Sequence, residues 1–405
     1  MKPFSLYLHI PYCLHKCPYC DFNTYALASV PEKDYVDSLL AELDFRASLA
    51  EWRGRTVQTI YFGGGTPSIF SDQSIARIVT GISRLFPVDD QAEITLEANP
   101  GTIDRELLGA LREMGVNRLS IGVQSFDGDI LKSLGRMHSP EQSENAVETA
   151  RVAGFENINI DIIYSTPGQT LGGLHHDLDQ AFKVKPDHIS MYGLTIEKGT
   201  PFYQSFKRGL LKLPPEDILV KMMEDINSQL PAHGYEHYEI SNFALSGREA
   251  RHNLAYWSGD DYLGLGAGAH SFVGCPQPFG QLYGIRWANY AAPAKYMQEA
   301  RSFGKADSWR EDLDRNNALF EYFFLGLRKI SGVSKLEFRL RFNMDLDLLY
   351  GEVVRMLSEQ GLLTDRADSI ALTQQGILLA DSVIEQFAET ARDMSYTPAY
   401  AKGMA

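Results

Sequence analysis

Apolar and polar positions along the first 200 residues repeat with two different periods. Short apolar runs rich in β-branched residues, such as INIDII, have the length of strands, and the segments between them have the spacing of amphipathic helices. Repeated strand–helix units of this kind predict a parallel sheet covered by helices. Strands are expected at residues 5–11, 56–63, 93–99, 118–125, 157–165 and 188–194. Helices are expected near residues 32–50, 71–86, 104–114, 140–153 and 170–184.

The polar and glycine-rich motifs of this region lie at or near the ends of the expected strands. In chain order they are Cys13, the glycine run at 63–67, Glu97, Gln124 and Asp161. In a (β/α) barrel the carboxyl ends of the strands form one mouth, where chemistry is normally placed. A doubly wound open sheet is the alternative, but it gathers ligands mainly at a switch point. We therefore expect an α/β fold, a partial TIM-like barrel of six strand–helix units with one site at its mouth.

The regular alternation stops after about residue 200, which ends the barrel region at 1–200. Residues 201–305 include a stretch at 236–272 that is rich in Tyr, His and Gly, and it is expected as strands and loops that close one side of the barrel. Residues 306–390 read as helices, a short β-like segment and a further helix. This order is typical of a small winged-helix-like domain, with a plain helical cap as the alternative. Residues 391–405 are expected to be a loose tail.

Composition excludes several classes of protein. A chain of 405 residues with 44% hydrophobic content can bury a large core. Its net charge of -14 gives no basic face for a phosphate backbone, so nucleic acid is not expected as a partner. No signal peptide and no apolar run of ~18 residues is visible, so we expect a cytosolic protein with reduced thiols. Peripheral contact with the inner face of a membrane remains open.

Three of the four cysteines lie in HIPYCLHKCPYCDF with the spacing C-x3-C-x2-C. Cys13, Cys17 and Cys20 can hold three irons of a cubane cluster and leave the fourth iron open for a ligand with nitrogen and oxygen donors. The alternatives are a zinc ion with His9 or His15 as fourth ligand, or reduced structural thiols. The spacing favours the iron–sulfur cluster, because zinc knuckles usually come in pairs.

This motif resembles the signature of the radical S-adenosylmethionine (SAM) proteins, C-x3-C-x-aromatic-C. Cys13, Cys17, Tyr19 and Cys20 match it residue by residue. The resemblance implies a 4Fe–4S cluster whose open iron chelates the amino and carboxylate groups of SAM. It also implies that one-electron reduction cleaves SAM to a 5'-deoxyadenosyl radical, with reduced flavodoxin or ferredoxin as the electron donor.

The glycine run GGGTP lacks the Lys-Ser/Thr ending of a phosphate loop. Its glycines allow a ligand to approach the backbone closely, and the Thr66 hydroxyl can bond a carboxylate or amine. A tight strand-to-helix turn is the alternative. Glu97, in EANP, could accept a hydrogen bond from a ribose hydroxyl or lie beside a cationic sulfonium. The alternative is that it caps the helix that follows Asn99 and Pro100. Gln124, Arg136 and Asp161 could instead serve hydrogen bonds within the barrel.

The motifs YLHIPYC, GGGTP, EANPG, VQSF, LGRMH and NIDIIY resemble one branch of the radical SAM family, that of oxygen-independent coproporphyrinogen III oxidase. The resemblance covers nearly the whole chain, including a C-terminal domain typical of the branch. It implies SAM contacts at Tyr7, Tyr19, Gly64, Gly65, Thr66, Glu97, Gln124, Arg136 and Asp161.

Within the branch, the chain resembles the HemW-type heme chaperones more than the oxidases. The oxidase pattern continues its cluster motif to a further cysteine, where this chain has Phe22, and oxidases carry an extension before the first strand. The motif RHNLAYW resembles H-N-x-x-Y-W, which HemW proteins use in connection with heme. It implies heme contacts at His252, Asn253, Tyr256 and Trp257. Taken alone, a histidine beside aromatic residues is more often a core residue than a ligand.

The sequence therefore predicts a heme chaperone that carries a 4Fe–4S cluster and SAM, and binds heme. The resemblance implies heme-accepting proteins as partners, with respiratory cytochromes as candidates, and a dimer is one oligomeric state to test. The first alternative is a coproporphyrinogen III oxidase that decarboxylates its substrate by radical chemistry. The second is a zinc-stabilised binding protein without redox chemistry.

Overall fold

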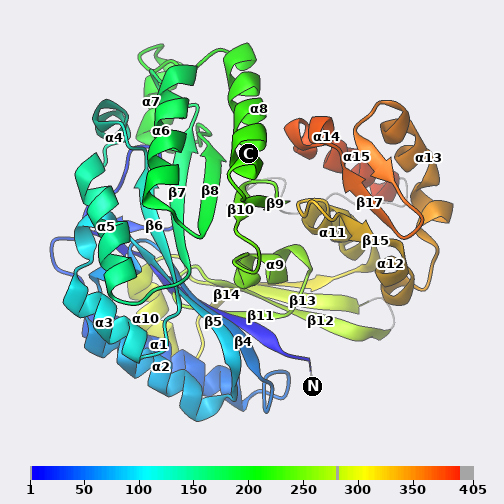
Figure 1. The fold of residues 1–405 in the computed structure, drawn as a ribbon. Helices are drawn as coiled ribbons and strands as arrows, with labels where there is room; N and C mark the ends of the chain where they lie inside the picture. Colours follow the sequence, from blue (N-terminus) through cyan, green and yellow to red (C-terminus); the bar gives the residue numbers. More distant parts are fainter. Residues whose placement is uncertain (1, 280–281, 393–405) are drawn as a thin grey trace.

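The computed structural model describes residues 2–279 and 282–392, and it contains the expected partial barrel (Figure 1). Its six parallel strands lie in sequence order, each hydrogen-bonded to the next. They are β1 (Phe4–Ile10), β4 (Val57–Gly64), β5 (Val88–Ala98), β6 (Arg118–Gln124), β7 (Ile158–Tyr164) and β8 (His188–Gly193). The hydrophobic pattern located all six, although β5 begins earlier than expected.

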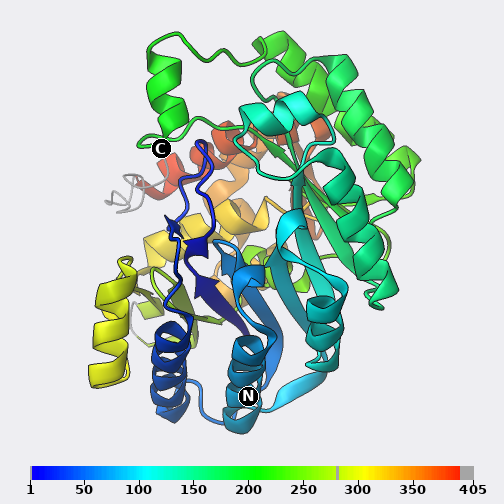
Figure 2. The ribbon, with the colours of Figure 1, turned by 90° about the vertical axis from the view of Figure 1, so that its left-hand side faces the viewer.

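Helices cover the outside of these strands, and consecutive helices pack against one another (Figure 2). The main helices are α1 (Glu32–Ser48), α2 (Asp72–Leu85), α3 (Arg105–Glu113), α5 (Pro140–Val152) and α6 (Leu171–Val184). Shorter elements line the mouth: β2 (Tyr12–Cys13), β3 (Tyr25–Ala26), η1 (Pro67–Ile69), η2 (Pro100–Thr102) and α4 (Gly128–Ser133). The mouth is therefore built from the segments that follow the strands.

Local sequence signals fix where the helices begin. Helix α5 starts with a capping box, in which the Gln142 backbone N–H bonds the Ser139 hydroxyl and the Gln142 side chain accepts from the Ser139 N–H at 2.8 Å. Pro140 occupies the first helical position, where its missing N–H costs nothing. Helix α2 begins after Ser71, whose hydroxyl accepts the N–H of Ser74. These signals are why the predicted and observed helix starts agree closely.

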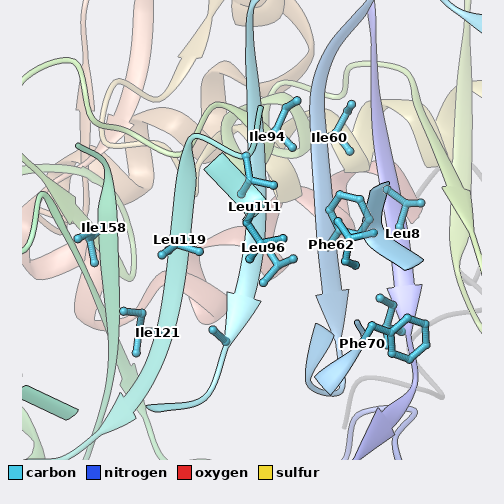
Figure 3. Close-up of a cluster of buried hydrophobic side chains, with 14 of the residues drawn as sticks. Leu8, Ile60, Phe62, Phe70, Ile94, Leu96, Leu111, Leu119, Ile121 and Ile158 are labelled. Carbon is cyan, nitrogen blue, oxygen red and sulfur yellow. The ribbon is translucent and has the colours of Figure 1, made fainter. Parts of the chain in front are cut away.

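The two faces of the barrel strands differ in chemistry. The outward face is apolar, and Leu8, Phe62 and Leu96 point from the strands toward the helices (Figure 3). Because side chains alternate along a strand, their neighbours Tyr7 and Glu97 point to the barrel interior. The interior is therefore lined by polar and aromatic side chains, which leaves it suited to a polar ligand.

Both edges of the parallel sheet carry further strands. Beside β1 lie β11 (Tyr262–Leu265), β12 (His270–Phe279), β13 (Leu282–Asn289) and β14 (Asp307–Leu313). Beside β8 lie β10 (Asn242–Ala244) and β9 (Glu236–Glu239). The connecting helices are α7 (Pro201–Lys207), α8 (Glu216–Ala232), α9 (Arg251–Trp257) and α10 (Pro293–Phe303). The strands thus form one twelve-stranded sheet that ends at β9 and at β14.

The C-terminal elements form the expected small winged-helix-like domain around a separate apolar core. Its expected start at residue 306 was wrong, because residues 307–313 form strand β14 of the large sheet. They are α11 (Arg315–Gly326), β15 (Val333–Ser334), α12 (Lys335–Phe342), α13 (Leu346–Glu359), β16 (Leu363–Asp365), β17 (Ser369–Leu372), α14 (Gln374–Leu378) and α15 (Ala380–Arg392). The three strands pair in the order β15-β17-β16. Most of the predicted tail, residues 393–405, lies outside the described residues.

The C-terminal domain bridges the two ends of the sheet. On the β13 side, Arg286 bonds Glu321 of α11 at 2.6 Å. On the β9 side, the chain after α11 forms a bridge between Lys329 and Glu239. Helix α11 also packs against α9 (Figure 1). Closure of the barrel on this side therefore depends on the C-terminal domain as well as on residues 236–272.

The expectation of strands and loops for residues 236–272 was wrong at RHNLAYW, which forms helix α9. Its cap residue, Ala250, offers no side-chain hydrogen bond. Instead, the carboxylate of Glu93 on β5 accepts the backbone N–H groups of Arg251 at 2.9 Å and His252 at 3.1 Å. An acidic group at a helix N-terminus satisfies free amides and the helix dipole. The partner that starts this helix lies far away in the sequence, so the local pattern did not reveal it.

Candidate cluster and cofactor site

The three motif cysteines lie in the segment between β1 and α1, where Cys13 ends the short strand β2. Figure 2 shows the course of this segment beyond the end of β1. All three are partly buried, and the Cys20 N–H bonds the Cys17 carbonyl at 3.1 Å. The loop is held from the other side of the mouth, where the Phe202 N–H of α7 bonds the Pro18 carbonyl at 3.0 Å. Tyr19, the aromatic residue of the motif, packs on Phe202 with ring centroids 6.1 Å apart.

Hydrogen bonds connect the thiols to three other segments at the mouth. The Thr66 hydroxyl donates to the Cys13 sulfur at 3.5 Å and accepts from the Asn99 side-chain amide at 3.0 Å. The guanidinium of Arg136 donates both to the Asn99 side-chain oxygen and to the Cys17 sulfur, the latter at 3.6 Å. Thr66 and Arg136, predicted from sequence, are thus brought together with the cysteines.

The arrangement fits a multi-iron cluster. Burial raises the pKa values of the Cys13 and Cys20 thiols. For Cys13, the hydrogen bond from Thr66 and the charge of Arg136 act in the opposite direction and favour the thiolate that binds metal. Within the described residues, no three His, Cys, Asp or Glu side chains are close enough to hold one metal ion. A 4Fe–4S cluster does not need such convergence, because each thiolate binds a different iron.

The glycine run packs against the cysteine loop. The N–H groups of Gly65 and Thr66 bond the carbonyls of Ile10 and Tyr12 at 2.8 and 2.9 Å. A Cβ on Gly65 would lie only 2.5 Å from the Tyr12 carbonyl oxygen, so only glycine fits there. Gly64 has φ of +111°, and its N–H bonds Glu97 at 3.0 Å. These amides are used within the protein, so the run first of all joins β4 to the cysteine loop.

Glu97 and Asp161 are partly exposed carboxylates inside the barrel. Burial raises the pKa of Glu97 to about 7, with a further rise from Asp161, although Tyr61 donates a hydrogen bond to it at 2.8 Å. Burial also raises the pKa of Asp161, which accepts from Ser120 at 3.2 Å and Asn159 at 2.8 Å. Two such groups can accept hydrogen bonds from a ligand or balance a cationic one.

Tyr7 and Gln124 complete the predicted SAM residues. The Tyr7 hydroxyl lies 2.9 Å from a ring nitrogen of His9, and its ring stacks on Tyr61. Gln124 ends β6 with φ of 69°, a left-handed conformation that is uncommon outside glycine. Asp177 of α6 holds the turn that follows, because it accepts the Phe126 N–H and the Ser125 hydroxyl. Strained backbone at a strand end is a frequent feature of binding sites.

The four predicted heme residues lie on α9, away from the cysteines. His252 is buried, and its two ring nitrogens lie 2.8 Å from the Thr59 hydroxyl and 3.1 Å from the Tyr256 hydroxyl. Asn253, Tyr256 and Trp257 are partly exposed. The structure therefore separates α9 from the cysteines, but one predicted SAM residue, Tyr7, lies next to His252, with ring centroids 6.3 Å apart.

Sequence reasoning missed two residues of this site. Asn99 was predicted only as the last residue of the strand at 93–99, but its side-chain amide links Thr66 to Arg136. Tyr61 was read as part of an apolar strand, but its hydroxyl holds Glu97. A usable signal existed for Tyr61, because it lies two positions before Gly63 and so shares the interior face of β4. No comparable signal marked Asn99.

Comparison with known proteins agrees with this geometry. Residues 7–181 match the family model of the Radical SAM superfamily, and residues 313–379 match that of the HemN C-terminal domain. The fold and the site together define a radical SAM protein, a class whose members carry a 4Fe–4S cluster and SAM.

Relatives of nearly full length narrow the assignment. The chain is 38% identical over 384 residues to the heme chaperone HemW of Bacillus subtilis, covering 95% of this chain and 98% of that protein. It is 38% identical over 388 residues to the heme chaperone HemW of Escherichia coli, covering 96% and 98%. The chain belongs to the HemW family.

A solved structure supports the same fold. The coproporphyrinogen III oxidase HemN of Escherichia coli, described as a radical SAM enzyme, superposes with a TM-score of 0.80 at 25% identity. The match covers 95% of this chain and 90% of that one. In the described part of this chain, no helix has the length and apolar character needed to cross a membrane.

Proposed function

We propose that the protein is a cytoplasmic heme chaperone that binds heme and passes it to heme-accepting proteins. The observation that carries the proposal is the similarity to named HemW proteins over almost the entire chain. Heme is flat, apolar and reactive, so its transfer needs a protein that covers its faces. Respiratory cytochromes are the candidate acceptors, and reduced flavodoxin or ferredoxin the candidate electron donors.

The residues at the mouth supply the cofactor site of this proposal. Cys13, Cys17 and Cys20 would hold the cluster, and bound SAM would supply a carbon radical after one-electron reduction. Arg136 balances thiolate charge through its contact with Cys17, and Asn99 keeps it oriented. Tyr7, Tyr19, Gly64, Gly65, Thr66, Glu97, Gln124, Arg136 and Asp161 are the proposed SAM contacts.

Two regions are candidates for the heme-binding site. The first comprises the H-N-x-x-Y-W residues of α9. A second region that suits a porphyrin is a pocket of about 480 Å³ beside the cysteine loop. Its walls include Phe202, Leu210 and Leu211, and Lys212 could meet a propionate.

An anaerobic heme titration of cluster-loaded protein, followed by Soret absorption, tests the proposal. Wild type should bind heme specifically, and His252→Ala and Leu210→Asp should report which region holds it. Iron and sulfide analysis of the same sample should approach cluster stoichiometry; zinc without sulfide would favour the zinc-stabilised alternative. Absence of specific heme binding by wild type would overturn the proposal.

The oxidase alternative is favoured by one observation, the close match of the fold to HemN. Against it stands Phe22, 65% exposed at the position where the oxidase pattern has a cysteine. We expect Phe22→Cys not to produce coproporphyrinogen oxidase activity, because the substrate site must differ elsewhere too. Substantial activity in an anaerobic oxidase assay would restore the oxidase assignment.

A further inference from the structure

We propose that helix α9 forms the floor of the SAM site and that His252 is a positioning residue for Tyr61 and Glu97, not an iron ligand. The inference rests on the proposed function, because the SAM site is part of it. It gives part of the H-N-x-x-Y-W motif a role in holding the cofactor site together.

The first argument is that both ring nitrogens of His252 already have partners. One lies 2.8 Å from the Thr59 hydroxyl, and the other lies 3.1 Å from the Tyr256 hydroxyl. The side chain is 1% exposed, and burial lowers its pKa to about 3. A neutral imidazole with one donor and one acceptor is satisfied by two hydroxyls. An axial ligand would need one nitrogen free and directed at an open face.

The second argument is a short path from His252 to the cofactor site. The His252 ring stacks on Tyr61, with centroids 5.0 Å apart and planes inclined by 29°. The Tyr61 hydroxyl donates to one oxygen of Glu97 at 2.8 Å, and the Gly64 N–H donates to the other at 3.0 Å. A flat buried ring under Tyr61 therefore sets the position of the hydroxyl that orients Glu97.

The third argument is the change in exposure along the interior. Tyr61 and Glu97 are partly exposed. Thr59, Glu93 and His252 are buried, with Glu93 anchoring the first amides of α9. His252 thus contacts the partly exposed Tyr61 from a buried position, where it can support ligand-binding groups without touching a ligand.

The test measures SAM affinity by equilibrium binding to anaerobic, cluster-loaded protein. His252→Ala removes the stacked ring, and Tyr61→Phe removes the hydroxyl that holds Glu97. We expect each to weaken SAM binding roughly three- to tenfold at unchanged iron content. The double variant should be little worse than either single one, because both act through the same contact. Arg251→Ala, which changes an exposed side chain on the same helix and keeps the backbone N–H bonded to Glu93, is the matched control.

His252→Phe separates support from ligation. Phenylalanine keeps a flat ring against Tyr61 but cannot bind iron. The proposal predicts SAM affinity closer to wild type than in His252→Ala, and an unchanged Soret spectrum in heme-loaded protein. A shifted Soret spectrum with normal SAM affinity in both variants would identify His252 as a heme ligand and overturn the inference.

The failure of this inference is distinguishable from that of the proposed function. If wild type does not bind heme but His252→Ala loses SAM affinity, the chaperone proposal fails and the positioning role stands. If wild type binds heme and SAM affinity is unaffected in all three variants, the positioning role fails. Should His252→Ala not fold, Tyr61→Phe and His252→Phe decide the question.

Discussion

The two ends of the barrel interior are built on different principles. At the mouth, polar groups meet at partly exposed thiols, and the sulfurs of Cys13 and Cys17 accept long, weak hydrogen bonds from Thr66 and Arg136. At the floor, which comprises Thr59, Glu93 and helix α9, buried groups hydrogen-bond one another. The Glu93 carboxylate, for example, accepts two backbone N–H groups of α9. The thiols at the mouth keep exposure and bonding capacity for a ligand, whereas Glu93 and His252 at the floor are held by protein partners.

This difference separates residues that bind from residues that support binding. A group that meets a ligand must keep some exposure and some unused bonding capacity, whereas a group that supports it is best fixed by protein contacts on all sides. Changes at the mouth should therefore abolish cofactor content. Changes at the floor should alter stability or affinity by smaller amounts.

The largest effect is expected for Cys17→Ala. Loss of one thiolate removes a ligand of the cluster and the partner of Arg136, so both the cluster and SAM binding should be lost completely. Iron and sulfide content and cluster absorption of anaerobically prepared protein check this. Cys275→Ala, a change at a cysteine outside the motif, should retain the cluster. An intact cluster in Cys17→Ala would refute the assignment of the mouth.

A steric change at the mouth should lower both the unfolding free energy and the cluster content. Gly65→Ala places a methyl group 2.5 Å from the Tyr12 carbonyl oxygen. We expect a loss of about 1–3 kcal/mol in unfolding free energy, with a displaced cysteine loop and reduced cluster content. Gly101→Ala is the matched control, because no atom lies within 4 Å of its added Cβ. Equal urea midpoints for the two variants would contradict the tight packing described here.

SAM binding should depend on pH through Glu97. Because its pKa is raised to about 7, this carboxyl is mostly protonated at pH 6 and mostly ionised at pH 8. If the carboxylate is the form that accepts from SAM, affinity should rise about tenfold over this interval. Equilibrium binding at the two pH values measures it. In Glu97→Gln the rise should disappear; a rise of the same size in that variant would assign it to another group.

The smallest effect is expected at the floor for Tyr256→Phe. This change removes the hydroxyl that bonds His252 but keeps the ring that packs on Tyr262. We expect a loss of about 1 kcal/mol in unfolding free energy, and SAM affinity within about twofold of wild type. Urea unfolding and SAM binding on one preparation measure both. A complete loss of SAM binding would mean that the floor participates in ligand contact.

The same contrast explains what the sequence could and could not predict. The contact of Thr66 with Cys13 followed from their places after two parallel strands, which end at the same mouth. Arg136, which lies beyond α4, was implied only by the family resemblance. The outward apolar face of each strand was also readable from its alternation. The early start of β5 was not, because residues 89–91 are polar or charged and exposed and carry no hydrophobic pattern.

Features that depend on partners distant in the sequence were not predictable. Helix α9 begins where Glu93 supplies a carboxylate from another strand, and Asn99 gains its role from Thr66 and Arg136. Neither contact leaves a local pattern. The same is true of the gap in the barrel wall, which the C-terminal domain bridges through Arg286 and Glu321.

The pairing of β1 with β11 has a consequence for the order of events in the cell. Ser5 pairs with Tyr262, so one edge of the first strand stays open until about 250 more residues have been made. At a synthesis rate of 5–20 residues per second this takes roughly 13–50 s. During that interval the cysteine loop, which follows β1, is attached to an incomplete barrel. The cluster can therefore be assembled in a complete mouth only after the ribosome has translated β11.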